Sequence, residues 1–569
     1  MNPPVPSTNP NPGRSGFHAG PLNAPAFFLL LAICLSAPLA YLMDVPERDV
    51  ANRYAPMAEA FAGGAWAFAF HPRVPMFHSA LCGVLIRLFG VGGFTAAKLV
   101  SAGCFAAAVF PLFGIMRRVF DETIAAGSLL IYVINPFLLR LSGSGLRENL
   151  KCLLLLMMVH AVFLIVERRK SPGRYLYLGA AAGILMITRS EMILFCGLML
   201  FGVMVYESYH ARYPWRSLAG TLMAAAFVCV PAFVNAAIFA LPTPEVRYLT
   251  LFEAVAGRAP TLADAILIAA ATPVLMSGIS WGIAHVFSGD RLKPMLIAAG
   301  IAFVAASLVL FVRQTLRTDR EFLFDVFLTF ERAFDPLWSV PALIGVAFRL
   351  RDRRFSPAEQ LLFVIIAVHT LVVVNQIVLY DRTVMFSLRY LVPVSPLGFG
   401  WTFCGVCTFA ILLGRYIPGV KTRPAAAVLL TAYVCGALFH CLGPLLKDYF
   451  EPRHKAVRSG TLQLAEIIRR HAPARSRAVA PAFDSADYEC AAAPGVFFER
   501  DSKYSVSAYL AGGRMVRGID HADFYVTAPD SSGAPSLPPT EGDWVPLDET
   551  VPMGRDGFCT VYRRGEVLP

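Results

Sequence analysis

The sequence predicts an all-α polytopic membrane protein with about thirteen transmembrane helices, followed by a small C-terminal α/β domain. Two features of the composition indicate this class: 56% of the 569 residues are hydrophobic and only 16% are charged. A soluble protein of this length carries about a quarter charged residues. The third feature is the arrangement, because apolar runs of about 20 residues, long enough to cross a bilayer core, recur through most of the chain.

The basic residues indicate how these spans are oriented. The formal net charge is +11, but the lysines and arginines form short groups between apolar runs, so membrane lipids are expected partners and nucleic acid is not. The groups fall in alternate loops: Arg117–Arg118, 168–170 with Arg174, Arg212 with Arg216, Arg291 with Lys293, 349–354, and Arg415 with Lys421 and Arg423. Such loops are typically cytoplasmic, which predicts a cytoplasmic N-terminus and an outward C-terminal segment.

The chain begins with a segment that is not expected to fold. Residues 1–25 are rich in Pro, Asn and Gly and predict a disordered cytoplasmic N-terminus. The first span, Ala26–Met43, has no small-residue cleavage site before it ends, so we expect it to remain as an anchor. Pro75–Gly90 is apolar but too short to span and carries His78 and Arg87, which favours an interfacial or re-entrant helix.

The end of the chain has a different composition. Residues 446–569 are less hydrophobic and have the size of a domain, which leaves 26–445 as the membrane domain. The expected elements of this extracytoplasmic α/β domain are a helix with an apolar stripe from Leu462 to Ile468 and strands at Ala522–Thr527 and Gly557–Arg563.

The twelve cysteines do not indicate a metal site. Most lie inside apolar runs, where cysteine behaves as a small apolar residue. Cys404 and Cys407 fall in the middle of such a run without histidine partners. We therefore expect neither a metal ion nor a cofactor.

The best candidate for chemistry is the acidic segment Pro46-Glu47-Arg48-Asp49, at the end of the first span. Charged residues at the rim of a span often act in catalysis or ion handling. A carboxylate at this place could accept a proton from an acceptor hydroxyl or amine while a lipid-linked donor lies beside it. Two simpler interpretations remain open, an ordinary solvated loop and an N-terminal helix cap at Asp49.

The residues after Asp49 predict a short amphipathic helix. Apolar residues recur at helical spacing from Tyr54 to Phe61, and Gly63-Gly64 ends the pattern. The two prolines of His71-Pro72-Arg73-Val74-Pro75 then force an extended stretch.

A second carboxylate occurs in the next outer loop. Arg147 and Glu148 lie at the mouth of the following span, where Glu148 could share a site with Asp49. The alternative is a mutually neutralising Arg147–Glu148 pair at a helix start, where the helix dipole favours the glutamate.

Taken in order, these motifs resemble the GT-C integral-membrane glycosyltransferases, nearest to the protein O-mannosyltransferases and the lipid A aminoarabinose transferases. The motifs that carry the resemblance are the acidic residue after the first span, the helix ending in Gly, His71-Pro72-x-x-Pro75, Leu146–Leu150, Gly183 with Thr188-Arg189-Ser190-Glu191, and Arg389-Tyr390-x-x-Pro393. The resemblance covers about residues 26–445. Two departures are visible: Arg48 precedes Asp49 where the family often has two acidic residues, and Ser190 replaces a common proline.

The resemblance implies a glycosyltransferase that uses a polyprenyl-phosphate-linked sugar and a glycan, lipid or protein acceptor, without metal, at the outer face of a bacterial inner membrane. It implies Asp49 as catalytic base, with Glu47 as the alternative, and Glu148 as the second acidic residue. The candidate phosphate and substrate contacts are Arg389, Tyr390, Arg147, Arg189, Glu191, His71 and Arg73. A guanidinium can make a forked contact with a phosphate. Arg389 is favoured among the arginines because it begins a Pro-bounded stretch that enters a span, although a headgroup anchor remains the alternative.

The main alternative function is a flippase for lipid-linked sugars or another transporter. Transporters often contain matching halves and charge at mid-depth. We find no repeat between the halves, and the charges gather toward one face. An oligosaccharide polymerase or ligase would be expected to centre on large outer loops in the middle of the chain.

Overall fold

The structure is a computed structural model of the whole chain. The residues it describes are 23–47, 49–64, 69, 76–167, 171–210, 214–233, 262–286, 335–352, 355–380, 390–416 and 452–471, parts of 298–312 and 428–439, and five strands between 495 and 564.

The described part of the chain is mainly helical, as predicted, and contains five helical segments that are long and apolar enough to cross a membrane. They are α1 (Asn23–Leu42), α5 with α6 (Gly93–Ala107 and Val109–Val119), α9 (Glu148–Val166), α18 (Pro357–Tyr380), and η7 with α19 (Val392–Gly398 and Phe399–Tyr416). A sixth span is made if α7 (Glu122–Ile134) and α8 (Pro136–Ser144), bent by 53° at Asn135–Pro136, count as one. The total of thirteen spans stays a prediction.

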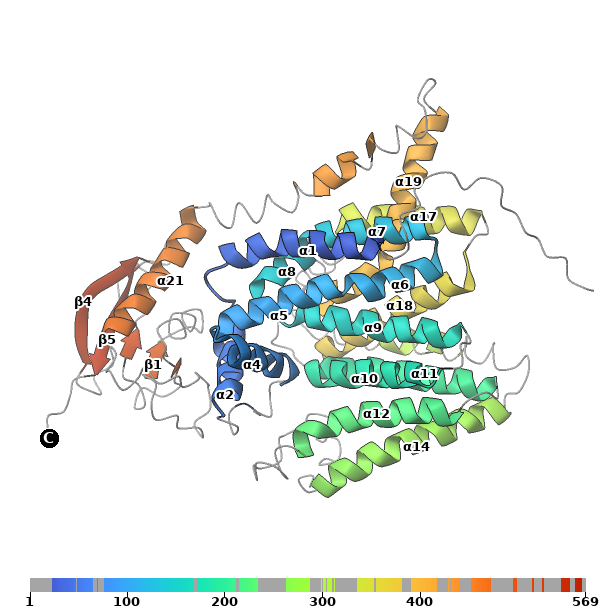
Figure 1. Cartoon of the computed structure of the whole chain (residues 1–569), viewed down its shortest axis with the longest axis horizontal. Helices are drawn as coiled ribbons and strands as arrows, with labels where there is room; N and C mark the ends of the chain where they lie inside the picture. The colour runs from blue at the N-terminus through green and yellow to red at the C-terminus, as the bar shows by residue number, and fades with distance from the viewer. Residues whose placement is uncertain are drawn as a thin grey trace, which may run out of the picture.

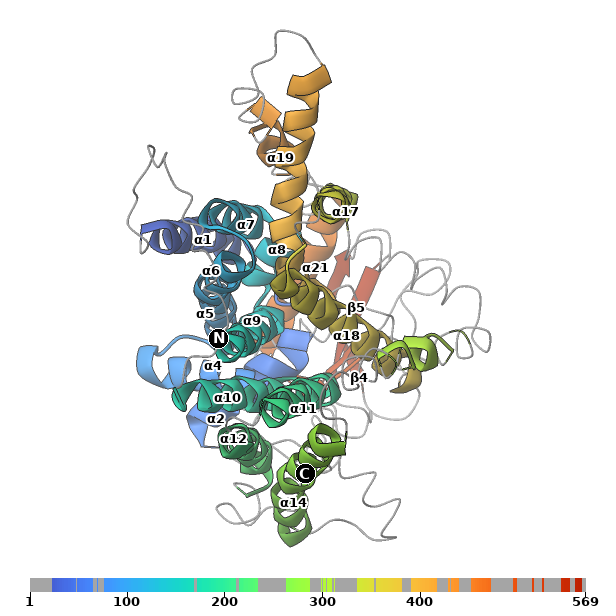
Figure 2. The same ribbon diagram turned by 90° about the vertical axis from the view of Figure 1, so that its right-hand side faces the viewer.

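Further helices lie alongside these spans. They are α10 (Gly173–Thr188), α11 (Ile193–Tyr209), α12 (Pro214–Phe233), α14 (Leu262–Val286) and α17 (Pro336–Arg351). Figure 1 shows α9, α10, α12 and α14 stacked in that order, and each packs against the next. Figure 2, which looks along the bundle, shows α17, α18 and α19 on another side of it.

Glycines allow α10 and α12 to approach closely. A Cβ atom at Gly179 of α10 would lie 1.9 Å from the carbonyl oxygen of Gly220 in α12, and one at Gly183 would lie 2.9 Å from that of Ala224. Such small-residue contacts are a common way for membrane helices to pack. This contact fixes the position of α10, whose C-terminal end enters the candidate site.

The first loop forms two short helices at one end of the bundle, called here the α2–α4 end (Figure 1). The helix predicted after Asp49 is confirmed: a π turn (Val50–Tyr54) runs into α2 (Ala55–Gly63), and Gly64 ends it with φ +79°. The helix α4 (Phe77–Phe89) packs against α2 and ends at Gly90, with φ +66°. Its 13 residues are about 20 Å long, less than the hydrocarbon thickness.

Basic residues gather at the opposite end, called here the basic end. Arg118, at the end of α6, pairs with Glu167 at the end of α9 (2.8 Å). Arg174, in the first turn of α10, donates to the carbonyl of Leu164. The Arg349 guanidinium lies 5.3 Å from the Phe120 ring, so the end of α17 belongs here too.

The C-terminal unit contains one described helix and one sheet. The helix α21 (Pro452–His471) packs on β4 and β5. The strands are β1 (Gly495–Phe498), β2 (Arg514–Met515), β3 (Phe524–Val526), β4 (Trp544–Pro552) and β5 (Phe558–Arg564), in the order β2-β1-β3-β5-β4. The two strands expected from the sequence are confirmed as β3 and β5, and Figure 1 shows this unit beside the α2–α4 end.

Candidate functional site

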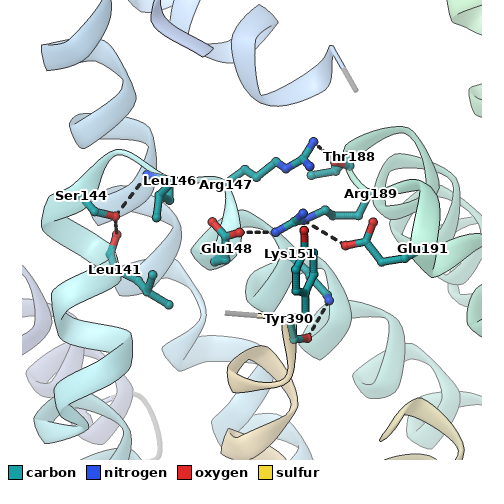
Figure 3. Close-up of polar contacts among 10 residues, drawn as sticks. All are labelled: Leu141, Ser144, Leu146, Arg147, Glu148, Lys151, Thr188, Arg189, Glu191 and Tyr390. Carbon is teal, nitrogen blue, oxygen red and sulfur yellow. Dashed lines mark hydrogen bonds and ion pairs between the residues drawn. The ribbon is translucent and has the colours of Figure 1, made fainter. Parts of the chain in front are cut away.

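Five charged residues meet at the start of α9 and at the turn between α10 and α11. This charged cluster consists of Arg147, Glu148, Lys151, Arg189 and Glu191. Figure 3 shows Glu148 and Glu191 on the two sides of the Arg189 guanidinium. Glu148 and Lys151 are fully buried, and Arg189 is only 2% exposed. Arg189 pairs with Glu148 through Nη2 and with Glu191 through Nε, at 3.2 Å from Oε1.

Local structure explains why the side chains of α9 point to this place. Gly145, with φ +76°, ends α8 and reverses the chain, so α9 starts at Glu148. A carboxylate in the first helical turn is favoured by the helix dipole. Lys151 follows three residues later and therefore lies on the same face of the helix.

The turn after α10 brings the second half of the cluster. The Thr188 hydroxyl donates to the Ile184 carbonyl (2.7 Å), and the helix ends there. Arg189 then has extended backbone, with φ −149° and ψ +110°, before Ser190–Met192 form one 3-10 turn. Arg147 donates to the carbonyl of Thr188 (3.2 Å), which joins the start of α9 to the end of α10.

Tyr390, which comes just before η7, is held against the cluster by two contacts. Its carbonyl accepts a hydrogen bond from Lys151 Nζ (2.9 Å), as Figure 3 shows. Its ring lies 4.8 Å from the Arg189 guanidinium. Tyr390 of the late Arg-Tyr-x-x-Pro motif therefore contacts Arg189 of one earlier acidic motif and Lys151, which directly follows the other.

Tyr54 connects the first loop to the cluster. The Arg147 guanidinium lies 5.2 Å from the Tyr54 ring. Burial raises the pKa of the Tyr54 phenol, Arg147 and Arg189 oppose the change, and Glu148 and Asp49 add to it. The Asp49 carboxylate is therefore close enough to Tyr54 to shift the pKa of the same phenol that the cluster residues shift.

Asp49 and Glu47 differ in their surroundings. Asp49 is partly buried at the start of the π turn, and Glu47 is exposed. The Asp49 side chain makes no capping hydrogen bond at this helix start, so the interpretation as a helix cap is wrong. A π turn inside a helical segment is often found at functional sites.

The charges of the cluster balance to a small positive excess. Burial raises the pKa of Glu191, but Arg189, Lys151 and Arg147 outweigh it and lower the pKa to about 2. Burial lowers the pKa of Arg189, and Glu191 and Glu148 reverse this, so its pKa is raised. With all five groups ionised, three cations and two carboxylates give +1. Such a site favours an anionic ligand.

Most of the predicted site residues that the structure describes lie together. The structure brings Arg147, Glu148, Arg189, Glu191 and Tyr390 into contact, with Asp49 at the edge near Tyr54. The idea that Glu148 is merely neutralised by Arg147 is corrected, because the guanidinium paired with Glu148 comes from Arg189, 41 residues away.

Three predicted residues, His71, Arg73 and Arg389, lie outside the described residues. Sequence reasoning missed Tyr54 as a contact and Lys151 altogether. A signal for Lys151 was present, since a lysine inside the apolar run of a span is a functional candidate by default.

Comparisons with known proteins found one family model and several solved structures that are similar to this chain. Residues 72–234 match the family model described as dolichyl-phosphate-mannose-protein mannosyltransferase. The archaeal oligosaccharyltransferase AglB from Archaeoglobus fulgidus, solved with an inhibitory peptide and a dolichol-phosphate, is 12% identical, with a TM-score of 0.54. The alignment covers 88% of this chain and 65% of that protein, so the chain spans slightly less than two thirds of its length.

A second solved structure is similar over almost its whole length. ArnT from Cupriavidus metallidurans bound to undecaprenyl phosphate is 13% identical, with a TM-score of 0.53, and the alignment covers 95% of this chain and 98% of that one. No curated protein matches the chain. At these identities the structural likeness concerns the fold.

Proposed function

Since this chain has the fold of the GT-C superfamily of integral-membrane glycosyltransferases, we propose that it moves a sugar from a polyprenyl-phosphate-linked donor to an acceptor at the outer face of the membrane. The observation that carries the proposal is the buried charged cluster next to the Asp49 turn. A lipid phosphate leaves with developing negative charge, and prearranged cations stabilise such charge in a site that excludes water.

The similar structures support a lipid phosphate as the ligand. AglB was solved with a dolichol-phosphate, and ArnT with undecaprenyl phosphate. The positive excess at the cluster suits the same chemical group in this chain. The proposed acceptor is a glycan, a lipid or a protein.

In the proposed reaction, the Asp49 carboxylate takes the proton of the acceptor hydroxyl or amine. The acceptor atom bonds to the anomeric carbon of the sugar, and the bond from that carbon to the phosphate oxygen breaks. The electron pair stays on the oxygen, and polyprenyl phosphate leaves. In this proposal Arg147, which is partly buried and donates to the carbonyl of Thr188, contacts the phosphate with its remaining N–H groups.

Glu148 has a different proposed role from Asp49. Its carboxylate is paired with the buried Arg189 guanidinium, so we assign it to positioning and not to proton transfer. Glu148 therefore assists by holding Arg189, and through it Glu191 and Tyr390, in position.

The sidedness of the site is part of the proposal. The cluster and the basic end lie at opposite ends of α9 and α10. Basic loops favour the cytoplasm, which supports an outward site, a cytoplasmic N-terminus and a periplasmic C-terminal unit in a bacterial inner membrane.

The test combines a deletion strain with the purified protein. Mass spectrometry of glycoconjugates should show one product that loses a sugar in the deletion strain and regains it with the parent chain. The purified full chain, in lipid nanodiscs with a labelled polyprenyl-phosphate sugar, should release polyprenyl phosphate. Unchanged glycoconjugates together with no release from any donor of this class would contradict the proposal.

A further inference from the structure

The interfacial helix α4 buries two adjacent polar groups that the proposed mechanism does not use. His78 and Ser79 are both fully buried. Among the described residues, neither Nε2 of His78 nor Oγ of Ser79 has a hydrogen-bond partner. Leaving a buried polar group unpaired costs free energy, so two such groups at successive positions of one helix call for an explanation.

The first of these residues, His78, lies next to the candidate site. The His78 ring meets the Tyr54 ring edge-on, with 5.4 Å between centroids. Tyr54 in turn contacts the Arg147 guanidinium. The Tyr54 ring therefore lies between the His78 imidazole and Arg147, the cation that we assign to the phosphate.

The neighbours of His78 determine its protonation. Burial, then Arg147 and Arg189, lower its pKa to about 3, so the ring is neutral at physiological pH. Burial raises the pKa of the Cys82 thiol, so that group keeps its proton. Cys82 Sγ lies 3.9 Å from Nδ1 of His78. A thiol that donates to Nδ1 leaves the imidazole proton on Nε2, the atom without a partner.

We propose that the Nε2–H of His78 donates a hydrogen bond to an oxygen of the bound glycosyl phosphate, with the Ser79 hydroxyl as a second contact. The inference rests on the proposed function and adds a substrate-contacting helix to it. A glycosyl phosphate offers acceptor oxygens on both the phosphate and the sugar. The neighbouring arginines would attract it to the side of α4 that carries His78.

The test uses variants that distinguish hydrogen bonding by the His78 nitrogens from packing of the His78 ring. His78→Phe keeps a ring against Tyr54 and removes both nitrogens, whereas His78→Gln keeps an N–H donor near the position of Nε2. Ser79→Ala only removes a hydroxyl, and it keeps the test available if His78→Phe does not fold.

His160→Phe is the matched control. His160 also meets a tyrosine ring edge-on, Tyr177 at 6.2 Å, and lies beside an arginine, Arg118, but at the basic end. Its loss should leave ligand binding unchanged.

Each purified variant is checked for folding by its Tm and titrated in nanodiscs with a polyprenyl-phosphate sugar and with polyprenyl phosphate alone. We expect His78→Phe to bind the glycosyl phosphate about tenfold more weakly and Ser79→Ala about threefold more weakly, with partial recovery in His78→Gln. Weakening with both ligands assigns the contact to a phosphate oxygen. Weakening with the sugar donor alone assigns it to a sugar hydroxyl.

Binding by folded His78→Phe and Ser79→Ala at the parent affinity for both ligands would overturn the inference. Parent-like binding by His78→Phe with weak binding by His78→Gln would assign His78 to packing and overturn it too. These results differ from a failure of the proposed function, in which the parent protein itself would release no polyprenyl phosphate.

Discussion

At the scale of single residues, the two acidic residues of the first loop have different surroundings. Asp49 is partly buried at the π turn and helps to raise the pKa of Tyr54, whereas Glu47 is exposed. A catalytic base must lie next to the reacting group, and of these two carboxylates Asp49 is the one that contributes to the pKa shift of Tyr54, beside the cluster.

Asp49→Asn should therefore reduce sugar transfer by about 10²–10⁴-fold and leave donor binding intact, because the amide keeps the shape and cannot take a proton. Glu47→Gln is the matched control and should transfer at nearly the parent rate. The measurement is transfer of labelled sugar by purified variants. The opposite result, with loss only in Glu47→Gln, would move the base to Glu47.

Glu148 should matter to stability as well as to activity. Removing one partner of a buried ion pair typically costs about 3–5 kcal/mol, and Glu148→Gln should fall near the lower end because Glu191 still pairs with Arg189. Glu466→Gln, which breaks the exposed 3.6 Å pair with Arg470 on α21, should change stability by less than about 1 kcal/mol. Thermal unfolding in detergent measures both. Equal decreases in Tm for the two variants would contradict the buried ion pair between Glu148 and Arg189.

His78 should give the protein a pH-dependent stability. Its pKa is lowered to about 3 by burial and by Arg147 and Arg189, so between that value and its ordinary pKa of about 6.5 the unfolded chain binds more protons than the folded one. Stability therefore falls as the pH drops below about 6.5, by at most about 1.4 kcal/mol per pH unit from this residue. The fall in Tm from pH 7.5 to 4.5 should be shallower in His78→Gln. Parallel curves would show that His78 is not buried and neutral.

At the scale of elements, the contact between α10 and α12 positions the turn that carries Arg189. Gly179 leaves no space for a methyl group, whereas Gly197 of α11 has no atom within 4 Å of a Cβ position. The same substitution therefore has different consequences in two neighbouring helices.

Gly179→Ala should force α10 and α12 apart and lower the stability by about 1–3 kcal/mol, as overpacking usually does. It should also weaken donor binding by displacing Arg189. Gly197→Ala should be neutral or slightly stabilising, since alanine is the better helix former. Tm and lipid-phosphate affinity are measured for both, and a harmless Gly179→Ala would contradict the close contact.

At the scale of the whole molecule, the separation of the basic end from the charged cluster predicts the topology. A reporter active only outside the cytoplasm should be active when fused after Pro569 and silent when fused after Glu167, at the basic end. A cytoplasmic reporter should give the reverse pattern. If the fusion after Pro569 reports the cytoplasm, the number of spans is wrong by one.

The sequence predicted those features that have a local cause. Hydropathy located the apolar spans, and the glycines at 63–64 located the end of α2. The partners of the charged residues have no local cause: Glu148 meets Arg189 across 41 residues, and Lys151 meets Tyr390 across 239. Those pairs depend on which helices pack together, which periodicity does not encode. For the same reason, the sequence predicted that Asp49 and Glu148 share a site. It did not predict that the Tyr54 ring lies between the first loop and Arg147.

The 239 residues between Lys151 and Tyr390 also separate these two groups in time during synthesis. At typical rates of synthesis, about 5–20 residues per second, the ribosome makes Tyr390 roughly 10–50 s after Lys151. During that interval the lysine of α9 is in a nascent membrane protein without the acceptor that it has in the finished one. A long lysine side chain can reach toward the headgroups for hydration, so α9 is expected to sit closer to the membrane surface at first. Its final depth, and with it the geometry of the cluster, is then set only when the second half of the chain arrives.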